Sequence, residues 1–282
     1  MISDVHHVGI AVSDMAAALR FYSEALHLPV VKEGDAPARG ARVTLIAVGG
    51  SYLELIQPVT DSSPFARHIE ERGEGLHHVA LRTDDVEALV ASLREWDVPL
   101  EDEQPREGFT GRLSFLAPEA MDGVLLEVVQ PSPELSGDNA PADVIRRIDH
   151  VVLRVPDVEE ACRRMLYYFG VETKRTFERG ETRFSFLRPG DVVLELIGPR
   201  EARDEPPAGS SDTDEAGPRT GFIAGLAFEC VGIDALAAEL KAKGCPIGEP
   251  HQALQGGRIV SVDADGACGV PVAFIDFTES PR

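Results

Sequence analysis

The sequence contains no uninterrupted apolar run of the roughly 18 residues that a membrane-spanning helix requires. It also lacks a basic N-terminal leader followed by an apolar segment, so no signal peptide is expected. Basic residues are scarce, since 48 acidic side chains stand against 27 basic ones and the formal net charge is −21. This charge disfavours binding to nucleic acid or to an anionic membrane surface, because both require clustered lysine and arginine.

Cysteine is rare and scattered. The four cysteines all lie in the second half of the chain, and none forms a close pair at a spacing typical of a metal site. We therefore expect reduced thiols and a cytoplasmic protein. With 43% hydrophobic and 27% charged residues, the 282-residue chain is typical of a soluble globular protein and long enough for two domains.

A strand pattern that carries a histidine recurs along the chain. It reads "HHVGIAV", then "HHVALR", then "DHVVLRV", so that His7, His78 and His150 stand 71 and 72 residues apart. A fourth apolar segment, "AGLAFEC", places Gly225 in the same position. Self-similarity at a nearly constant period indicates that one structural unit occurs four times.

Each of these strands is followed by a polar turn and then by apolar residues at helical spacing. The helical segments begin near an aspartate or a serine, such as Ser13, and these residue types cap helices. Two or three further strand-like runs follow each helix, for example "ARVTLIAV" and "SYLELIQP" in the first repeat. The sequence therefore predicts an α+β fold built from four units, each consisting of a strand, a helix and two or three further strands.

Two polar segments interrupt the repeats. The first, "SPELSGDNAPAD", is rich in proline, serine, glycine and aspartate and predicts a linker over 132–145. This linker would separate one domain at 1–131 from a second domain at 146–282. The other segment, at about 200–219, is acidic and nearly free of apolar residues, which predicts a mobile loop between the third and fourth modules.

Two acidic residues interrupt apolar strands at the same point of the first two repeats, namely Glu54 and Glu127. Strand alternation places His7 on the same face as Gly9, whose small size leaves room above the sheet. A buried carboxylate is costly unless it is paired or bound to a metal. We therefore predict that His7, Glu54, His78 and Glu127 hold a divalent metal ion with nitrogen and oxygen ligands and open positions for water or substrate.

The histidines that precede these ligands, His6 and His77, take the opposite face of their strands. That face is mostly apolar and suits packing against helices. We expect these two side chains to pack or to bond to the backbone, and not to bind metal.

Several segments resemble the vicinal oxygen chelate superfamily, in which βαβββ modules pair into an open, metal-holding cup. The whole chain resembles that superfamily as two paired-module domains, and residues 1–131 resemble its methylmalonyl-CoA epimerases. The resemblance implies one divalent metal ion of the Co, Zn, Mn, Ni or Mg class, held by His7, Glu54, His78 and Glu127. The matching segments are "HHVGIAVSDMAAALRFY", "LELIQP", "GLHHVALRTDDVEAL", "PREGFTGRLSFLAP" and "GVLLEVVQP".

The resemblance also implies a reaction, the interconversion of (2R)- and (2S)-methylmalonyl-CoA by α-proton abstraction with a metal-stabilised enolate. Inversion requires a proton donor and a proton acceptor on opposite sides of the carbon, and Glu127 and Glu54 are the expected pair. The small-molecule acyl-CoA substrate carries phosphates that need positive charge. Candidates to bind them are Arg106, Arg112, Arg39 and Arg42.

Two positions depart from the epimerase pattern. Val43 stands where some epimerases carry an additional carboxylate, which leaves the identity of the second base open. Phe109 stands where the family usually has a small residue, and it could narrow the pocket or change the acyl group accepted.

The second half, 146–282, resembles a diverged pair of the same modules. It keeps His150 and Glu195, whereas Gly225 and Ala273 occupy the other two ligand positions. We therefore expect no catalytic metal there. Structural support, a pocket for another small ligand and an interface all stay open for this half, and the chain could be a monomer or a homodimer.

Other functions are compatible with the same fold. A glyoxalase I-like lactoylglutathione lyase would use a similar set of histidine and glutamate ligands and similar proton chemistry. A metal-free small-molecule-binding protein would lack the ligand set that the first half retains. A ring-cleaving dioxygenase is disfavoured, because its two-histidine, one-carboxylate iron site usually lies in the second half, which is degenerate here.

Overall fold

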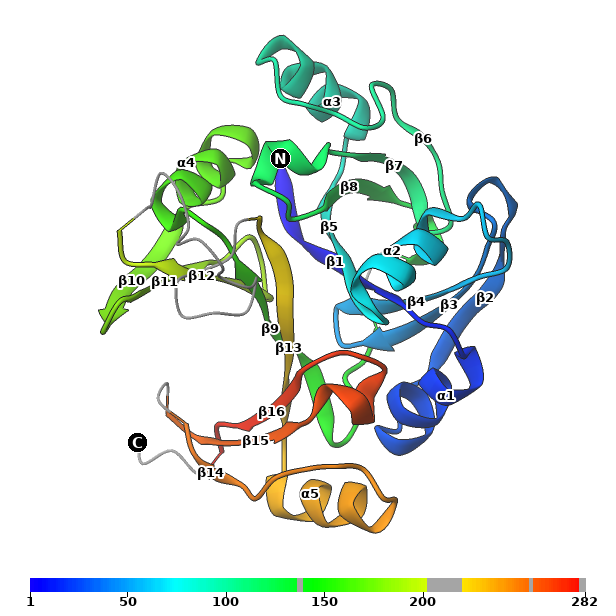
Figure 1. The fold of residues 1–282 in the computed structure, drawn as a ribbon, viewed down its shortest axis with the longest axis vertical. Helices are drawn as coiled ribbons and strands as arrows, with labels where there is room; N and C mark the ends of the chain where they lie inside the picture. The colour runs from blue at the N-terminus through cyan, green and yellow to red at the C-terminus, as the bar shows by residue number, and fades with distance from the viewer. Residues whose placement is uncertain (136–138, 202–219, 254–255, 279–282) are drawn as a thin grey trace. The chain divides into compact units, whose positions relative to one another are not determined.

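The computed structural model describes residues 1–135, 139–201, 220–253 and 256–278. These residues form two eight-stranded sheets, in the orders β2-β3-β4-β1-β5-β8-β7-β6 and β10-β11-β12-β9-β13-β16-β15-β14 (Figure 1). One helix follows the first strand of every repeat. The predicted α+β fold of four repeated modules is thus confirmed. Within the described ranges, no helix combines the length and the apolar character that crossing a membrane requires.

The first sheet contains the first two repeats. Each repeat contributes four strands. One of them, at the edge of the sheet, does not coincide with an apolar run of the sequence. The strands are β1 (Ile2–Ala11), β2 (Val30–Ala36), β3 (Ala41–Val48), β4 (Ser51–Pro58), β5 (Gly75–Thr83), β6 (Arg106–Glu107), β7 (Gly111–Phe115) and β8 (Leu126–Pro131).

The second sheet contains the third and fourth repeats and has the same strand order. Its strands are β9 (Ile145–Arg154), β10 (Thr173–Arg179), β11 (Thr182–Leu187), β12 (Val193–Pro199), β13 (Phe222–Cys230), β14 (His251–Gln252), β15 (Arg258–Val262) and β16 (Val272–Asp276).

The helices are short and connect the strands. One of them, α2 (Pro64–Arg72), lies between β4 and β5 and was not predicted. The others are α1 (Met15–Leu19), the π-helix η1 (Arg20–Ala25) that continues it, α3 (Val86–Glu95), α4 (Val158–Phe169), α5 (Ile233–Ala242) and the 3₁₀ turns η2 (Pro37–Arg39), η3 (Pro118–Met121), η4 (Pro133–Leu135) and η5 (Ala264–Ala267).

Aspartates begin the repeat helices. The carboxylates of Asp14, Asp85 and Asp157 accept hydrogen bonds from backbone N–H groups in the first turns of α1, α3 and α4. The expected cap Ser13 is therefore wrong by one residue. In the fourth repeat, Asp276 of β16 accepts hydrogen bonds from the backbone N–H groups at the start of α5. All four helices thus begin with a carboxylate on their unpaired N–H groups, which stabilises a helix start.

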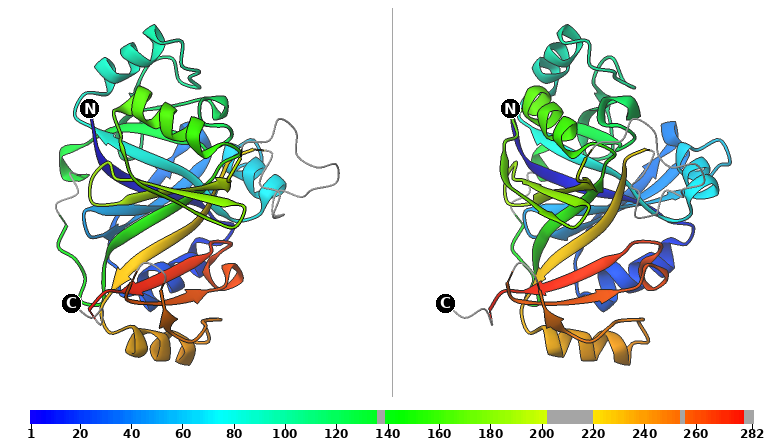
Figure 2. Two further views of the ribbon diagram at one scale, coloured as in Figure 1. Left: turned by 90° about the vertical axis from the view of Figure 1, so that its left-hand side faces the viewer. Right: turned by 60° about the vertical axis from the view of Figure 1, so that its left-hand side comes forward.

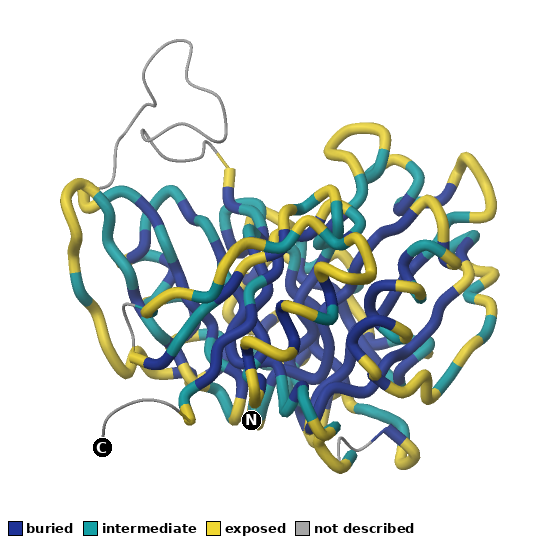
Figure 3. The backbone as a smooth tube through the Cα atoms, turned by 90° about the horizontal axis from the view of Figure 1, so that it is seen from below, coloured by how far each residue is buried: buried dark blue, intermediate teal, exposed yellow. Residues whose placement is uncertain are grey.

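The strands bury one apolar face completely. Val8 and Ile10 of β1 are 0% exposed, as are Leu53 and Leu55 of β4. Figure 3 shows these buried strands in dark blue and the exposed connections in yellow. The residues that alternate with the predicted ligands thus form a buried apolar face, and the ligands project from the other face of the sheet.

The two histidines that were assigned to packing behave as expected. His6 is 1% exposed, and its Nε2 donates to the carbonyl oxygen of Leu135 at 3.0 Å. The ring of His77 contacts the rings of Phe65 and His68, each with a centroid distance of 4.8 Å. Both side chains thus act in packing on β1 and β5.

Packing divides the chain into two compact units. The first comprises Met1–His6, His78–Ser136 and His150–Ala224, and it joins the second repeat to the third. Within it, the Arg164 guanidinium of α4 donates to the carboxylate of Asp122 at 2.8 Å. This charged hydrogen bond is partly buried, which makes it stronger than an exposed ion pair.

The other unit comprises His7–His77, Gly137–Asp149 and Gly225–Arg282, and it joins the first repeat to the fourth. Within it, η1 packs against η5, and the two lie next to each other in both views of Figure 2. The hydroxyl of Tyr22, which is 0% exposed, donates to the carbonyl oxygen of Ala267 at 2.8 Å.

The predicted domain boundaries, 1–131 and 146–282, stay a prediction. Of the predicted linker at 132–145, residues 136–138 lie outside the described residues. The same holds for residues 202–219 of the predicted acidic loop.

The bond between Tyr22 and Ala267 gives a prediction for stability. Tyr22→Phe keeps the ring but removes one donor to the carbonyl oxygen of Ala267, which still accepts from the backbone N–H of Val270 at 3.3 Å. The loss of the hydroxyl bond should cost about 0.5–1.5 kcal/mol of unfolding free energy. Tyr167→Phe is the matched control, because that side chain is 58% exposed and its change should stay within about 0.5 kcal/mol. Urea unfolding measures both. Equal stability of Tyr22→Phe and the parent would contradict the assigned bond.

Candidate metal centre

The parallel pairing of β1 with β4 places the first predicted ligand pair on one face. Glu54 is opposite Gly9, which is two residues after His7, so both side chains project from the same side of the sheet. Nε2 of His7 lies 3.6 Å from Oε2 of Glu54. The small residue opposite the carboxylate leaves the space in which this contact forms.

The second repeat reproduces this arrangement. Glu127 of β8 is opposite Ala80 of β5, which is two residues after His78. Nε2 of His78 lies 3.8 Å from Oε2 of Glu127. The alignment of the two histidine–glutamate pairs, which the sequence suggested from position alone, therefore follows from equal strand register in both repeats.

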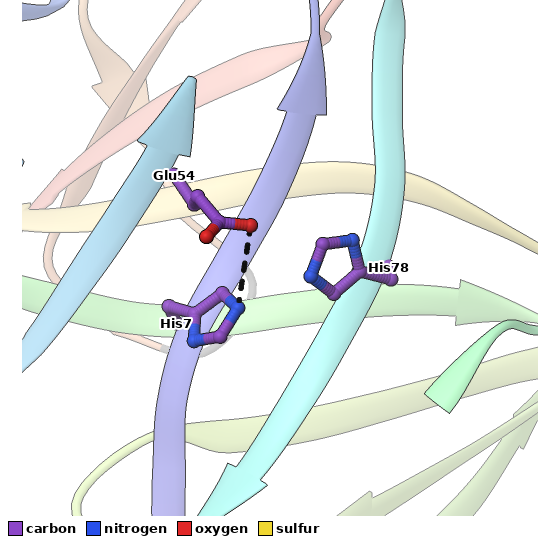
Figure 4. A group of neighbouring side chains, drawn as sticks. All are labelled: His7, Glu54 and His78. Atoms are coloured by element: carbon purple, nitrogen blue, oxygen red, sulfur yellow. Dashed lines mark ion pairs between the residues drawn. The ribbon is translucent and has the colours of Figure 1, made fainter. Parts of the chain in front are cut away.

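Three of the four predicted ligands form a single group. One ligand atom from each of His7, Glu54 and His78 lies within 4.8 Å of the others. Figure 4 shows these side chains turned toward one another from β1, β4 and β5. Glu127, the fourth predicted ligand, is not part of this group and contacts it through His78. Two imidazole nitrogens and a carboxylate oxygen at this spacing suit a divalent metal ion.

The whole set is buried. His7 is 0% exposed, His78 1%, Glu127 2% and Glu54 7%. Burial raises the pKa of Glu54 from 4.5 to about 7, because desolvation disfavours its charged form. A cation at this position would offset that penalty, since an opposite charge favours the ionised carboxylate.

The sequence did not predict the contacts that two residues near the ligands, Phe115 and Arg106, make. The ring of Phe115 meets the ring of His78 edge-on at a centroid distance of 5.2 Å. The guanidinium carbon of Arg106 lies 5.8 Å from the centroid of the same Phe115 ring. Phe115 is also the register partner of Glu127, which is why both side chains lie on one face. Its place in the strand "GRLSF", next to the strand of Glu127, was the available signal.

The arginines predicted to bind phosphate have carboxylate partners in this structure. Arg106 donates from Nε to Asp102 at 3.0 Å, and Arg112 contacts Glu87 and Glu107. Arg42 lies 3.8 Å from Asp35. These groups lie at the protein surface or are partly buried there, and their binding to CoA stays a prediction.

The two positions that depart from the epimerase pattern differ in setting. Val43 is 3% exposed and is two residues before Leu45, the register partner of Glu54, so it lies on the ligand face. Phe109 belongs to the connection between β6 and β7. An apolar side chain at Val43 means that this position supplies no proton-transfer group.

The third repeat keeps one pair and the fourth keeps none. Nε2 of His150 lies 3.3 Å from Oε2 of Glu195, and Glu195 is opposite Val152 in the same parallel register. In the fourth repeat, Ala273 pairs with Ala227, two residues after Gly225. The second sheet therefore repeats the backbone of the first without its complete ligand set.

Comparisons with known proteins point to one protein family. A family model described as "Glyoxalase/Bleomycin resistance protein/Dioxygenase superfamily" matches residues 6–115 and 149–261. An ethylmalonyl-CoA/methylmalonyl-CoA epimerase of Cereibacter sphaeroides is 32% identical over 133 residues, which are 46% of this chain and 99% of that protein. A Brassica oleracea protein named "Putative lactoylglutathione lyase" is 25% identical over 178 residues, 62% of this chain and 57% of its own length.

A solved structure is similar over the full length. A triple mutant of 4-hydroxymandelate synthase from Streptomyces coelicolor matches 100% of this chain and 94% of its own, with a TM-score of 0.73. The sequences are 16% identical, so this similarity shows a shared fold alone. The four-module arrangement therefore occurs in another protein of known structure.

The raised pKa of Glu54 gives a prediction for metal binding. A metal ion held by Glu54 would bind its carboxylate form, so below pH 7 a proton would have to leave Glu54 as the ion enters. The affinity for Co²⁺ should decrease as the pH is lowered below about 7. In that range, the parent protein should release about one more proton per bound ion than Glu54→Gln does. Calorimetric titrations in buffers of different ionisation enthalpy count these protons. Equal proton release by the two proteins would show that Glu54 is not a ligand.

Proposed function

Because the chain belongs to the Glyoxalase/Bleomycin resistance protein/Dioxygenase superfamily, we propose that residues 1–131 bind a divalent metal ion and interconvert (2R)- and (2S)-methylmalonyl-CoA. The observation that carries the proposal is the buried group of His7, Glu54 and His78, with Glu127 beside His78. The epimerase relative from Cereibacter sphaeroides supports the substrate class, since it is similar over nearly its entire length.

The donor set fits the metal that the reaction needs. His7, Glu54, His78 and Glu127 would hold it, and no other described group combines three such side chains at ligand spacing. When bound, a divalent ion supplies a positive charge that stabilises the negative charge formed on a thioester oxygen. In the proposal, the second domain at 146–282 contributes no catalytic metal, because its fourth repeat has Gly225 and Ala273 in the ligand positions.

The carboxylates of the chain would move the proton. The α-proton of methylmalonyl-CoA lies between a thioester and a carboxylate, and inversion removes it on one side and returns one on the other. Glu127 is proposed for one side and Glu54 for the other. A carboxylate bound to a metal is a weaker base, so one of the two must be released during turnover.

Buried apolar side chains surround the carboxylates. Leu45 and Val43 lie on the face that carries Glu54, and they are 0% and 3% exposed. Phe115 covers the edge of His78. In such an environment a proton removed from the substrate stays on the carboxylate that accepted it, and the electrostatic interactions are stronger than in water.

The CoA part of the substrate would bind outside the metal group. Arg106 and Arg112 are proposed to contact its phosphates, which would replace the carboxylates that these arginines contact now. A cytoplasmic location and a monomeric or homodimeric state complete the proposal and stay untested predictions.

Proton exchange tests the proposal directly. Metal-loaded protein is incubated with methylmalonyl-CoA in D₂O, and the α-proton signal is followed by NMR. We expect the signal to disappear in the parent protein. Glu127→Gln and Glu54→Gln should each slow loss of the α-proton from the epimer whose proton faces the removed carboxylate by at least about 10²-fold, because each removes one proton-transfer group.

The neighbouring histidines give a matched pair of controls. His78→Ala should abolish exchange and lower the bound metal measured by mass spectrometry. His77→Gln, one residue away on the opposite face of β5, should preserve both. If the metal-loaded parent protein does not exchange the α-proton, the epimerase proposal is contradicted. The glutathione hemithioacetal of methylglyoxal would then be the next substrate to measure.

A further inference from the structure

The third repeat has aromatic residues where the first has buried aliphatic ones. On β3, Val43 and Leu45 are the register partners of Ile56 and Glu54. On β11, Phe184 and Phe186 are the register partners of Ile197 and Glu195. Val43 and Leu45 are buried, whereas both phenylalanines are partly exposed. The face of the third repeat that carries Glu195 therefore offers aromatic surface to solvent.

These partly buried rings lie nearly parallel. The ring of Phe177 on β10 is tilted by 12° from Phe184 and by 18° from Phe186, with centroid distances of 4.9 and 5.8 Å. The guanidinium carbon of Arg175 lies 5.3 Å from the centroid of Phe177. Large apolar side chains are usually buried in the core, where their hydrophobic surface stabilises the fold. Three nearly parallel rings that are only partly buried instead form a patch on which a planar group can stack.

A cation lies on the same face. Arg154 of β9 is the register partner of Ile197, which is itself the partner of Phe184. Nε of Arg154 is buried and donates no hydrogen bond within the described parts of the chain. A buried polar group without a partner is costly, and more so when it is charged. An anion that binds here would remove that cost, and a two-oxygen anion matches the fork of a guanidinium group.

The polar pair on this face, His150 and Glu195, does not provide an anionic partner for Arg154. Glu195 contacts His150 at 3.3 Å, so its charge is directed to the imidazole. The equivalent positions in the fourth repeat are Gly225 and Ala273, which have no ligand atoms in their side chains. The face therefore differs from a metal centre in its residues and has an aromatic and cationic character instead.

We propose that this face of the third repeat, formed by Arg154, Phe177, Phe184 and Phe186, binds a planar aromatic ring that carries an anionic group. The ring stacks on the phenylalanines, and the anion binds Arg154. Such chemistry occurs in aromatic carboxylic acids and in nucleotides, and the two sources are distinguished by experiment. The site is separate from the proposed metal centre and does not depend on the proposed epimerase activity.

Calorimetric titration of the full chain in EDTA tests the proposal with three probes. These are 2-naphthoate, adenosine 3′,5′-bisphosphate and the uncharged 2-naphthalenemethanol. We expect one of the two anions to bind and the uncharged probe to bind at least about tenfold more weakly, because it lacks the bond to Arg154. The anion that binds identifies the source of the ligand.

Variants place the binding on this face. Arg154→Gln should weaken binding at least about tenfold, and Phe186→Leu, which restores the type of residue in the first repeat, about fivefold or more. Arg200→Gln is the matched control, since it makes the same change of charge at an exposed arginine that pairs with Glu178. It should leave the affinity unchanged. Circular dichroism verifies that each variant is folded.

Three results would overturn the proposal. One is that neither anion binds the parent protein at millimolar concentration. Another is that Arg154→Gln and Arg200→Gln bind the anion equally well. The last is that His78→Ala abolishes binding, which would assign the ligand to the metal centre of the first two repeats. Retention of binding by His78→Ala, together with loss in Arg154→Gln, supports the site and is independent of whether the epimerase reaction occurs.

Discussion

Two carboxylates buried within a sheet set the condition that the surrounding residues must satisfy. Glu54 and Glu127 are 7% and 2% exposed, and burial of a charge is unfavourable unless a partner compensates it. Parallel strand pairing brings a histidine to each of them, with Nε2 to Oε2 distances of 3.6 and 3.8 Å. Gly9 opposite one carboxylate and Ala80 opposite the other provide the space. Strand order, register and small residues thus serve the same electrostatic requirement.

Much of this arrangement follows from local sequence. Alternation along a strand fixes the face of each side chain, so the amino-acid order alone assigns His7 and Gly9 to one side of β1. The repeats then transfer that assignment to His78 and Ala80. The separation of Glu127 from the group of three could not be predicted, because it depends on distances of a few ångströms between side chains on different strands.

Other features depend on tertiary context and escaped prediction for that reason. The helix α2 (Pro64–Arg72) has few apolar residues and only Phe65 buried, so its periodicity gave little signal. The choice of Asp14 over Ser13 as the cap is a matter of one residue, and both types are good caps. The union of the second repeat with the third in one compact unit rests on contacts such as that of Arg164 with Asp122, which are remote in sequence.

The core and the ligand face vary independently. Leu194 and Leu196 of β12 are 0% exposed on one side of the strand, while Glu195 between them points to the other. Substitutions on the ligand face therefore leave the packed face intact, which explains how Gly225 and Ala273 are tolerated in the fourth repeat. The same independence allows Phe186 in the third repeat at the register position of Leu45 in the first.

Covalent linkage of the four modules also changes what evolution can do with them. In a symmetric homodimer every substitution appears twice, so a change that suits one copy of a site is imposed on the other. Here each module is encoded separately, and a mutation in the third repeat leaves the ligands of the first two untouched. One half of the chain can retain an ancestral chemistry under selection while the other half explores new ligands without cost to it. The presence of Gly225 and Ala273 at the ligand positions of the fourth repeat is an asymmetry of this kind.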